Sequence, residues 1–273
     1  MKVKKNICSL LTALSLSSSF SPSSAVAYDK NDNYVDDKVS ERIKKPAAFV
    51  FVEERFPCAD YAFYEEPSAC DAETKVNTVY SFGSGVVLAD KKNTKYVLTA
   101  DHVLPKYNSN FIVNIHAPKS KTFVKAKVYK RDAKRDLALL LIDKNNTENV
   151  PSASDICFGT GYSIGDHVVS VGYTNYNLSF IEGLVHSLNS LSLITISGHF
   201  ISGNSGGITY AFSEGKPVGI GVMAVSGDGT FDGLNGIISS ERVHQFLNGT
   251  PVEDYNGARC KEVEKSEKES TGK

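Results

Sequence analysis

Several features that mark particular classes of protein are missing from this sequence. The five cysteines include no Cys-x-x-Cys pair, and no histidine lies near enough in sequence to complete a ligand set, so we expect neither a zinc site nor a reactive thiol. Outside the amino terminus, the one dense basic stretch, 119–135, is interrupted by acidic and apolar residues. This interleaving argues against nucleic-acid binding.

A long hydrophobic run is also missing. The apolar run 7–16 is too short to cross a membrane as a permanent helix, so no stable membrane span is expected. Basic residues precede this run and the small residues 25–27 follow it, which predicts that 1–27 is a secretory signal peptide. The alternative is an uncleaved anchor or an unstructured terminus. Export to the periplasm or out of a bacterial cell is the expectation.

Cysteine usage agrees with export. Cys8 would leave with the signal peptide, and Cys58, Cys70, Cys157 and Cys260 are an even set in a compartment where disulfides persist. A Cys58–Cys70 bridge is favoured because it closes a short loop of polar and turn-forming residues between two strand-like segments. Cys157 and Cys260 either pair with each other or leave Cys260 free.

The sequence contains enough apolar residues to form a sizeable core, since 41% of its 273 residues are hydrophobic. Short strand-like runs recur with turn signals between them, which predicts an all-β barrel or sandwich without deciding which. The expected strands are 47–52, 77–89, 94–98, 111–115, 121–129 and 137–142, then 167–173, 182–186, 191–197, 207–211, 217–225 and 236–239. The polar segment 143–155 separates the two sets, and an amphipathic helix is expected at 240–248.

These elements suggest one folded domain at 46–250 with two halves, at about 46–143 and 156–240. On either side, the sequence is charged and lacks apolar periodicity. We therefore expect 28–45 to be a flexible lead-in and 251–273 to be a disordered tail.

Ser205 lies in the stretch 198–207, where three of the last five residues are glycine. Glycine allows a tight turn that leaves backbone N–H groups pointing toward a bound group. A serine in such a turn is a candidate nucleophile. Because its hydroxyl is weakly nucleophilic at neutral pH, it would need a base, an acid to orient that base, and an oxyanion site.

The chain offers both partners beside strand-like runs. His102 directly follows an apolar run, at the kind of strand-to-loop junction that holds catalytic side chains, and it is the candidate base. Asp136 stands at the mouth of the buried run 137–142, where a carboxylate could hydrogen-bond an imidazole. Asp132 is a weaker rival because it lies in a charged turn, and Asp101 is expected to face solvent because it neighbours His102 on an extended strand.

The order His102, Asp136, Ser205, in the strings TADHV, RDLALL and SGNSGG, resembles the trypsin/chymotrypsin superfamily of serine proteases. The strings GSGVVLAD (83–90), GDHVVSVGY (165–173), IEGLVHSL (181–188) and NGIISS (235–240) are more narrowly similar to bacterial HtrA/Deg-type peptidases. The similarity runs from about residue 46 to about 248. It implies two six-stranded antiparallel β-barrels and a short carboxy-terminal helix.

The resemblance also implies the chemistry. Ser205 would attack a peptide carbonyl, His102 would carry the proton, and Asp136 would orient the imidazole. The N–H groups of Gly203 and Ser205 would form the oxyanion hole, with no metal or cofactor. Protein or peptide substrates are therefore expected, whereas nothing in the sequence indicates an oligomeric state.

In this superfamily the segment before the nucleophile and a following strand form the substrate pocket. Here the candidate residues are His199, Ser202, Ala224 and Val225. Since no carboxylate lies at 199–202, a preference for lysine or arginine is not expected, and small or aliphatic side chains are favoured. Asn204 replaces the aspartate of animal digestive members, so activation through an ion pair with a new amino terminus is not expected.

Two other functions are compatible with these residues. One is a binding module that keeps the protease fold without activity, although the presence of all three residues argues against it. The other is a hydrolase acting on esters in general, which the two-barrel resemblance disfavours.

The two dozen polar residues after the helix could not form the further carboxy-terminal binding domain of HtrA-type members, so the resemblance is to the protease core alone.

Overall fold

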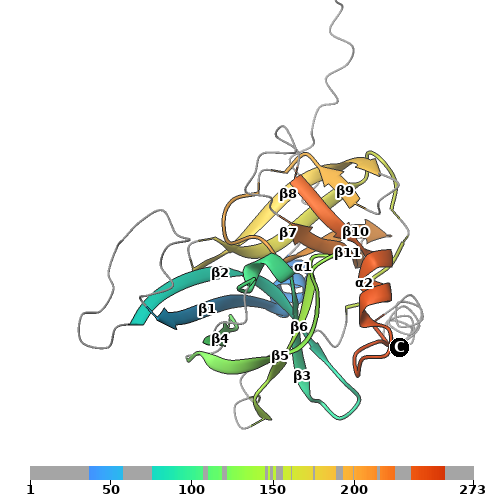
Figure 1. The fold of residues 1–273 in the computed structure, drawn as a ribbon. Coiled ribbons are helices and arrows are strands. Elements are labelled where there is room, and N and C mark those ends of the chain that lie inside the picture. Colours follow the sequence, from blue (N-terminus) through green and yellow to red (C-terminus); the bar gives the residue numbers. More distant parts are fainter. Residues whose placement is uncertain are drawn as a thin grey trace, which may run out of the picture. The chain divides into compact units, whose positions relative to one another are not determined.

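The computed structural model of this chain describes residues 37–57, 76–106, 110–118, 122–144, 147, 150–151, 156–160, 162–174, 176–188, 193–198, 200–213, 216–224 and 235–255 (Figure 1). All of them belong to one unit that spans Val35–Lys273. They form twelve β-strands and two α-helices.

Six strands form a first barrel. They are β1 (Ala47–Pro57), β2 (Val76–Ala89), β3 (Lys95–Thr99), β4 (Asn110–His116), β5 (Val124–Asp132) and β6 (Leu137–Ile142). All pairings are antiparallel, and the order β1-β2-β3-β6-β5-β4 closes because β1 pairs with both β2 and β4. Along β5, Val124 and Ala126 are buried while Lys125 and Lys127 are exposed, the period-2 alternation of a strand with one face on a core.

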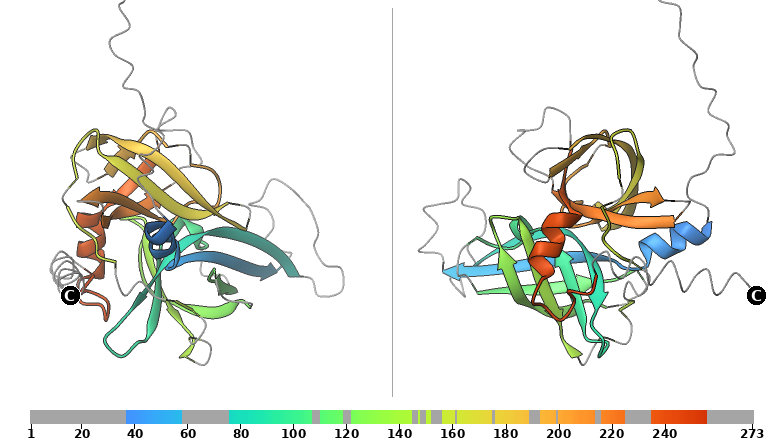
Figure 2. Two further views of the ribbon diagram at one scale, coloured as in Figure 1. Left: turned by 180° about the vertical axis from the view of Figure 1, so that it is seen from behind. Right: turned by 90° about the vertical axis from the view of Figure 1, so that its right-hand side faces the viewer.

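Six further strands form a second barrel. They are β7 (His167–Thr174), β8 (Asn177–Leu188), β9 (Leu193–Ile196), β10 (Ile208–Ser213), β11 (Lys216–Ala224) and β12 (Asn235–Ser239), in the closed antiparallel order β10-β11-β12-β9-β8-β7. The helix α2 (Ser240–Leu247) follows β12 and lies against β11 and β12 (Figure 2). The predicted architecture of two six-stranded antiparallel barrels and a short carboxy-terminal helix is confirmed.

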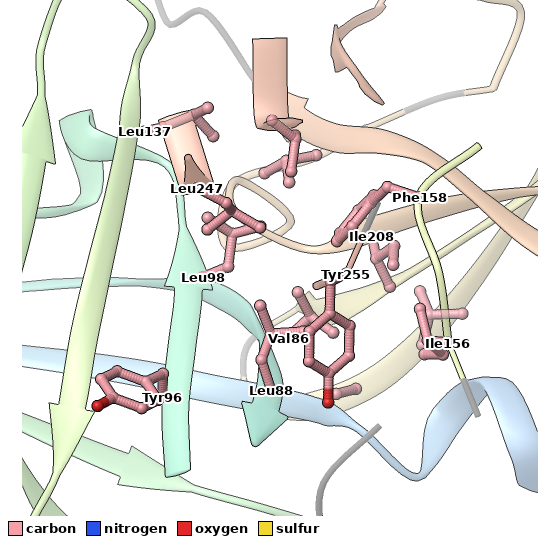
Figure 3. Close-up of a cluster of buried hydrophobic side chains, with 14 of the residues drawn as sticks. Val86, Leu88, Tyr96, Leu98, Leu137, Ile156, Phe158, Ile208, Leu247 and Tyr255 are labelled. Carbon is pink, nitrogen blue, oxygen red and sulfur yellow. The ribbon is translucent and has the colours of Figure 1, made fainter. Parts of the chain in front are cut away.

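Three clusters of buried apolar side chains hold this fold together. Two of them fill the barrels, and the largest joins them. In the joining cluster, Leu98 and Leu137 of the first barrel meet Ile208 of the second, with Leu247 of α2 and Tyr255 (Figure 3). Each large apolar side chain buried in this way contributes about 1.5–3 kcal/mol to folding, so the packing fixes one barrel against the other.

Two segments expected to be flexible are structured. Within the supposed lead-in 28–45, the helix α1 (Asp37–Lys44) forms because Val39 and Ile43, four residues apart, share one face that packs on the joining cluster. Within the supposed tail 251–273, residues 251–255 are structured, because the side chains of Val252 and Tyr255 are buried in the joining cluster. Each is only 1% exposed. Residues 1–27 and 256–273 lie outside the described part of the chain.

Tyr255 is further fixed by hydrogen bonds at both ends. The N–H of Ala89 donates to the Tyr255 hydroxyl at 3.0 Å, and the N–H of Phe158 donates to the Tyr255 carbonyl at 3.2 Å.

Neither helix in the described residues is long and apolar enough to span a membrane.

Candidate active site

His102 and Asp136 are adjacent because of strand pairing. His102 lies in a 3-10 turn, Asp101–Val103, just after β3, and Asp136 ends the turn just before β6. β3 and β6 are antiparallel, with Thr99 opposite Ala138, so the chain leaves β3 beside the point where it enters β6. The two side chains therefore come from loops at one edge of the first barrel.

Ser205 belongs to the second barrel, in the turn before β10, yet its hydroxyl meets the imidazole of His102. The distance from His102 Nε2 to Ser205 Oγ is 2.8 Å, and that from His102 Nδ1 to Asp136 Oδ2 is also 2.8 Å. The backbone N–H of His102 donates to Asp136 Oδ1 at 2.9 Å. A neutral imidazole that donates from Nδ1 to a carboxylate presents Nε2 as an acceptor for a hydroxyl. The structure thus brings the three predicted residues together.

The backbone of Asp136 is fixed in an uncommon conformation. Its φ of 56° lies in the left-handed region, which aspartate tolerates better than most residues. Its N–H donates to Ala133 O at 3.3 Å, and its carbonyl accepts from the N–H of Asp101 at 3.1 Å. These bonds tie the carboxylate to the turn that carries His102.

The turn around Ser205 requires glycine. Gly203 and Gly206 have φ values of 98° and 89°. A Cβ on Gly206 would lie 2.1 Å from Ser84 O and 2.2 Å from Thr99 Oγ1, distances that no real side chain could adopt. The chain at Ser205 can therefore pack closely against the first barrel only because residue 206 has no side chain.

Ser84 is a site residue whose role the sequence does not reveal. It is fully buried on β2, and its N–H donates to Ser205 O at 2.7 Å. Its hydroxyl donates to Gly203 O at 2.6 Å and accepts from the N–H of Tyr173 at 2.7 Å. Ser84 thereby links both barrels to the serine turn. The glycines on either side of it, in the string GSG, were the available signal for such a close approach.

Asn204 has a comparable structural role, and its side chain is fully buried. Its Nδ2 lies 3.1 Å from Tyr173 O, 3.0 Å from Thr174 Oγ1 and 3.2 Å from Ser179 Oγ. Its Oδ1 accepts from the N–H of Ile201 at 2.8 Å. Sequence reasoning marked this residue only as a replacement for aspartate, whereas here its amide ties the serine turn to β7 and β8.

Asp101 is not solvent-facing, so that expectation is wrong. Its side chain is only 8% exposed and forms a two-pronged ion pair with Arg131 of β5, with Nε–Oδ1 at 2.6 Å and Nη2–Oδ2 at 3.1 Å. Arg131 also donates to Pro105 O at 2.8 Å. The expectation failed because it assumed an extended strand, whereas the chain at Asp101 turns into a 3-10 helix. Asp132 binds Arg135 within its own turn.

The candidate pocket residues are only partly described. Ser202 is exposed and Ala224, at the end of β11, is partly buried. His199 and Val225 lie outside the described residues, as do Cys58 and Cys70 with their predicted bridge.

Among the described residues, no three or more side chains of His, Cys, Asp or Glu are grouped as metal ligands would be. Burial raises the pKa of Tyr173 to about 12. The site therefore contains a hydroxyl, an imidazole and a carboxylate that are linked in this order by short contacts. This arrangement is suited to proton transfer from a serine nucleophile.

Comparisons with known proteins show similarity to proteases. The chain is 26% identical over 191 residues to the magnetosome formation protease MamE of Paramagnetospirillum magneticum, and 29% identical over 199 residues to the serine protease Do-like HtrA of Lactobacillus helveticus. The alignments cover 64% and 67% of this chain but only 24% and 46% of the two relatives, so the chain spans less than half the length of either.

A crystal structure of the serine endoprotease from Yersinia pestis has the same fold, with a TM-score of 0.54 and 19% identity over 78% of this chain and 65% of that one. A family model described as trypsin-like peptidase domain matches residues 83–220, which is half of the chain. The chain therefore belongs to the trypsin-like peptidase family, and its core is similar to that of a Do-like HtrA protease.

Proposed function

We propose that this protein is a serine endopeptidase that hydrolyses peptide bonds with Ser205 as nucleophile, His102 as general base and acid, and Asp136 as the orienting carboxylate. The observation that carries the proposal is the pair of 2.8 Å contacts that link Asp136 to His102 and His102 to Ser205. Family membership supports it, because the match to the trypsin-like peptidase domain, residues 83–220, includes all three residues.

The reaction follows from these contacts. As Ser205 Oγ bonds to the scissile carbonyl carbon, its proton passes to His102 Nε2, and Asp136 stabilises the resulting imidazolium. The same proton then goes to the amine as the carbon–nitrogen bond breaks, leaving an ester on Ser205. A water molecule, deprotonated by His102, attacks the ester and releases the acid, which regenerates the hydroxyl.

The N–H groups of Gly203 and Ser205 would stabilise the oxyanion. The positive φ of Gly203 supports this assignment, since it turns the peptide groups of the serine loop into an orientation that other residues adopt only with strain.

For the residue before the scissile bond, we favour a small or aliphatic side chain. The segment 199–202 contains no carboxylate to pair with a bound lysine or arginine, and a buried cation without a partner is costly. His199, Ser202, Ala224 and Val225 are the residues expected to determine this preference.

Export to the periplasm or the exterior is part of the proposal. The segment 1–27 has the sequence pattern of a signal peptide. The disulfide-bonded state of Cys157 supports an oxidising compartment, and its partner lies outside the described residues.

The test is reaction of the purified mature protein with a fluorophosphonate probe, followed by mapping of the labelled residue by mass spectrometry. We expect labelling at Ser205 alone, and its loss in Ser205→Ala and His102→Ala. Ser163→Ala and His186→Ala, which alter an exposed serine and an exposed histidine, are matched controls and should label normally. Absence of labelling in a folded wild-type protein would contradict the proposal and favour an inactive binding module.

A further inference from the structure

Ser84 forms hydrogen bonds with all of its polar groups, and its partners come from both barrels. Its N–H donates to Ser205 O at 2.7 Å, and its carbonyl accepts from Thr99 Oγ1 at 2.6 Å. Its hydroxyl lies 2.6 Å from Gly203 O and 2.7 Å from the backbone nitrogen of Tyr173. Because the residue is 0% exposed, solvent does not readily replace a partner that is lost.

The direction of the hydroxyl proton follows from the chemistry of its two neighbours. A backbone N–H can only donate, so the hydroxyl accepts from Tyr173. A carbonyl oxygen can only accept, so the single hydroxyl proton of Ser84 points at Gly203 O. Ser84 therefore holds, by its oxygen, the peptide unit that joins Gly203 to Asn204.

This peptide unit is held at its other end as well, since the N–H of Asn204 donates at 3.0 Å to a carbonyl of the same turn. The peptide unit that joins Ser205 to Gly206 is fixed in the same way. Ser84 donates to its oxygen at 2.7 Å, and its N–H donates to Met223 O at 2.8 Å. Two peptide units of the serine turn are thus fixed at both ends, and Ser84 is the partner common to both.

The proposed oxyanion donors lie beside these two peptide units. The N–H of Ser205 belongs to the peptide unit between them, and the N–H of Gly203 belongs to the unit just before the first. A peptide unit is planar, so its N–H turns only when the backbone dihedrals on either side of it change. Holding the neighbouring units therefore limits how far either N–H can turn away from a developing oxyanion, and such donors are effective only when they are preorganised.

The space around Ser84 is fitted to a side chain of this size. A Cβ on Gly172 would lie 2.9 Å from Ser84 Oγ, so the hydroxyl is accommodated because Gly172 has no side chain. A Cβ on Gly83 would lie 2.9 Å from Ser205 O. The serine turn therefore approaches this part of β2 more closely than a side chain at position 83 would allow.

We propose that Ser84 is a positioning residue for the oxyanion hole, because its hydroxyl sets the orientation of the N–H groups of Gly203 and Ser205 without contacting the substrate. Ser84 lies on β2 of the first barrel, whereas both donors belong to the second. The hole therefore has its working geometry only while the two barrels are packed together. The inference rests on the proposed function, since an oxyanion develops only if Ser205 attacks a carbonyl.

The test compares Ser84→Ala with Ser170→Ala. Ser170 is also 0% exposed, and its hydroxyl lies 2.7 Å from Thr209 Oγ1 within the second barrel, so each variant loses a buried hydroxyl contact. We expect Ser84→Ala to lower kcat for cleavage of unfolded casein about 10- to 100-fold, because the oxyanion donors are misaligned but still present. Fluorophosphonate labelling of Ser205 should slow by a similar factor. KM should stay within about twofold of the wild-type value, as expected when only transition-state contacts are weakened.

Ser170→Ala should keep the wild-type kcat and labelling rate. Ser84→Cys has a similar volume but donates only weakly from its thiol, so its kcat should lie between those of Ser84→Ala and the wild-type protein. Circular dichroism checks that each variant is folded, and Ser84→Cys decides the question if Ser84→Ala does not fold.

A wild-type kcat and labelling rate in the folded Ser84 variant would overturn the inference and leave the proposed function intact. An equal fall in kcat in Ser170→Ala would also overturn it, because the loss would then follow from removal of any buried hydroxyl rather than from the orientation of the oxyanion donors. Absence of labelling in the wild-type protein would contradict the proposed function and this inference with it.

Discussion

At the scale of single residues, the candidate site depends on side chains other than those of His102, Asp136 and Ser205. Asp101 and Arg131 fix the turn that carries His102, while Ser84 and Asn204 fix the turn that carries Ser205. His102, Asp136 and Ser205 could be predicted because they are reactive residue types beside strands or among glycines. The supporting residues could not, because their roles depend on contacts across the sequence, such as those from Ser84 to Gly203 and from Asp101 to Arg131.

The Asp101–Arg131 pair gives a prediction at this scale. Arg131→Met should lower the free energy of unfolding by about 3 kcal/mol, because it leaves the nearly buried Asp101 carboxylate without its cation. Urea denaturation measures this effect. Asp101→Asn combined with Arg131→Met should restore part of the loss, since the buried charge is then gone.

Arg135→Met is the matched control. Arg135 pairs with Asp132 within one turn, and its own side chain is 37% exposed, so its loss should cost less than about 1 kcal/mol. Equal losses in Arg131→Met and Arg135→Met would show that burial of Asp101 does not govern the stability of the His102 turn.

At the scale of elements, short strands with turn signals were sufficient to predict most of both barrels, for example the hairpin of β2 and β3 around 90–93. The sequence underestimated α1 because its helical face contains only two apolar residues, Val39 and Ile43, among many charges. That face becomes stable only by packing on the cluster between the barrels, and such tertiary packing is not visible in local sequence.

The serine turn gives the prediction for this scale. Gly206→Ala should strongly reduce labelling of Ser205 and destabilise the protein, because the new Cβ would collide with Ser84 O and Thr99 Oγ1. Gly165→Ala is the matched control: Gly165 has a similar φ of 92° but nothing within 4 Å of its Cβ position. It should cost only about 1–2 kcal/mol for the backbone and leave labelling unchanged. Normal labelling of Gly206→Ala would show that the turn can relax without moving the proposed nucleophile, Ser205.

At the scale of the whole molecule, the three candidate catalytic residues are divided between the barrels. The first barrel contributes His102 and Asp136, the second contributes Ser205, and so the 2.8 Å contact between His102 and Ser205 exists only when the barrels are packed together. Strand periodicity could not distinguish two barrels from a sandwich, because both give short alternating strands. The family resemblance supplied that distinction, and the apolar cluster between the barrels gives its physical basis.

Tyr173 makes this packing sensitive to alkaline pH. It is 3% exposed, lies in the cluster between the barrels, and its ring centroid is 5.6 Å from that of Phe49 in the first barrel. Burial raises its pKa from 10.0 to about 12. Between these two pH values the unfolded chain loses this proton while the folded chain keeps it, so the free energy of unfolding must fall as pH rises.

We therefore expect the free energy of unfolding of the wild-type protein to decline from about pH 10 to about pH 12. The free energy of unfolding of Tyr173→Phe should decline less steeply over the same interval, because phenylalanine keeps the ring contact and has no proton to lose. Urea denaturation at a series of pH values measures both slopes. Tyr162, whose pKa is raised to about 12 by burial and by the nearby Glu241, adds to the decline, so Tyr162→Phe should reduce the slope as well. Identical slopes for the wild-type protein and Tyr173→Phe would show that the phenol at the junction of the barrels becomes accessible to solvent before the protein unfolds.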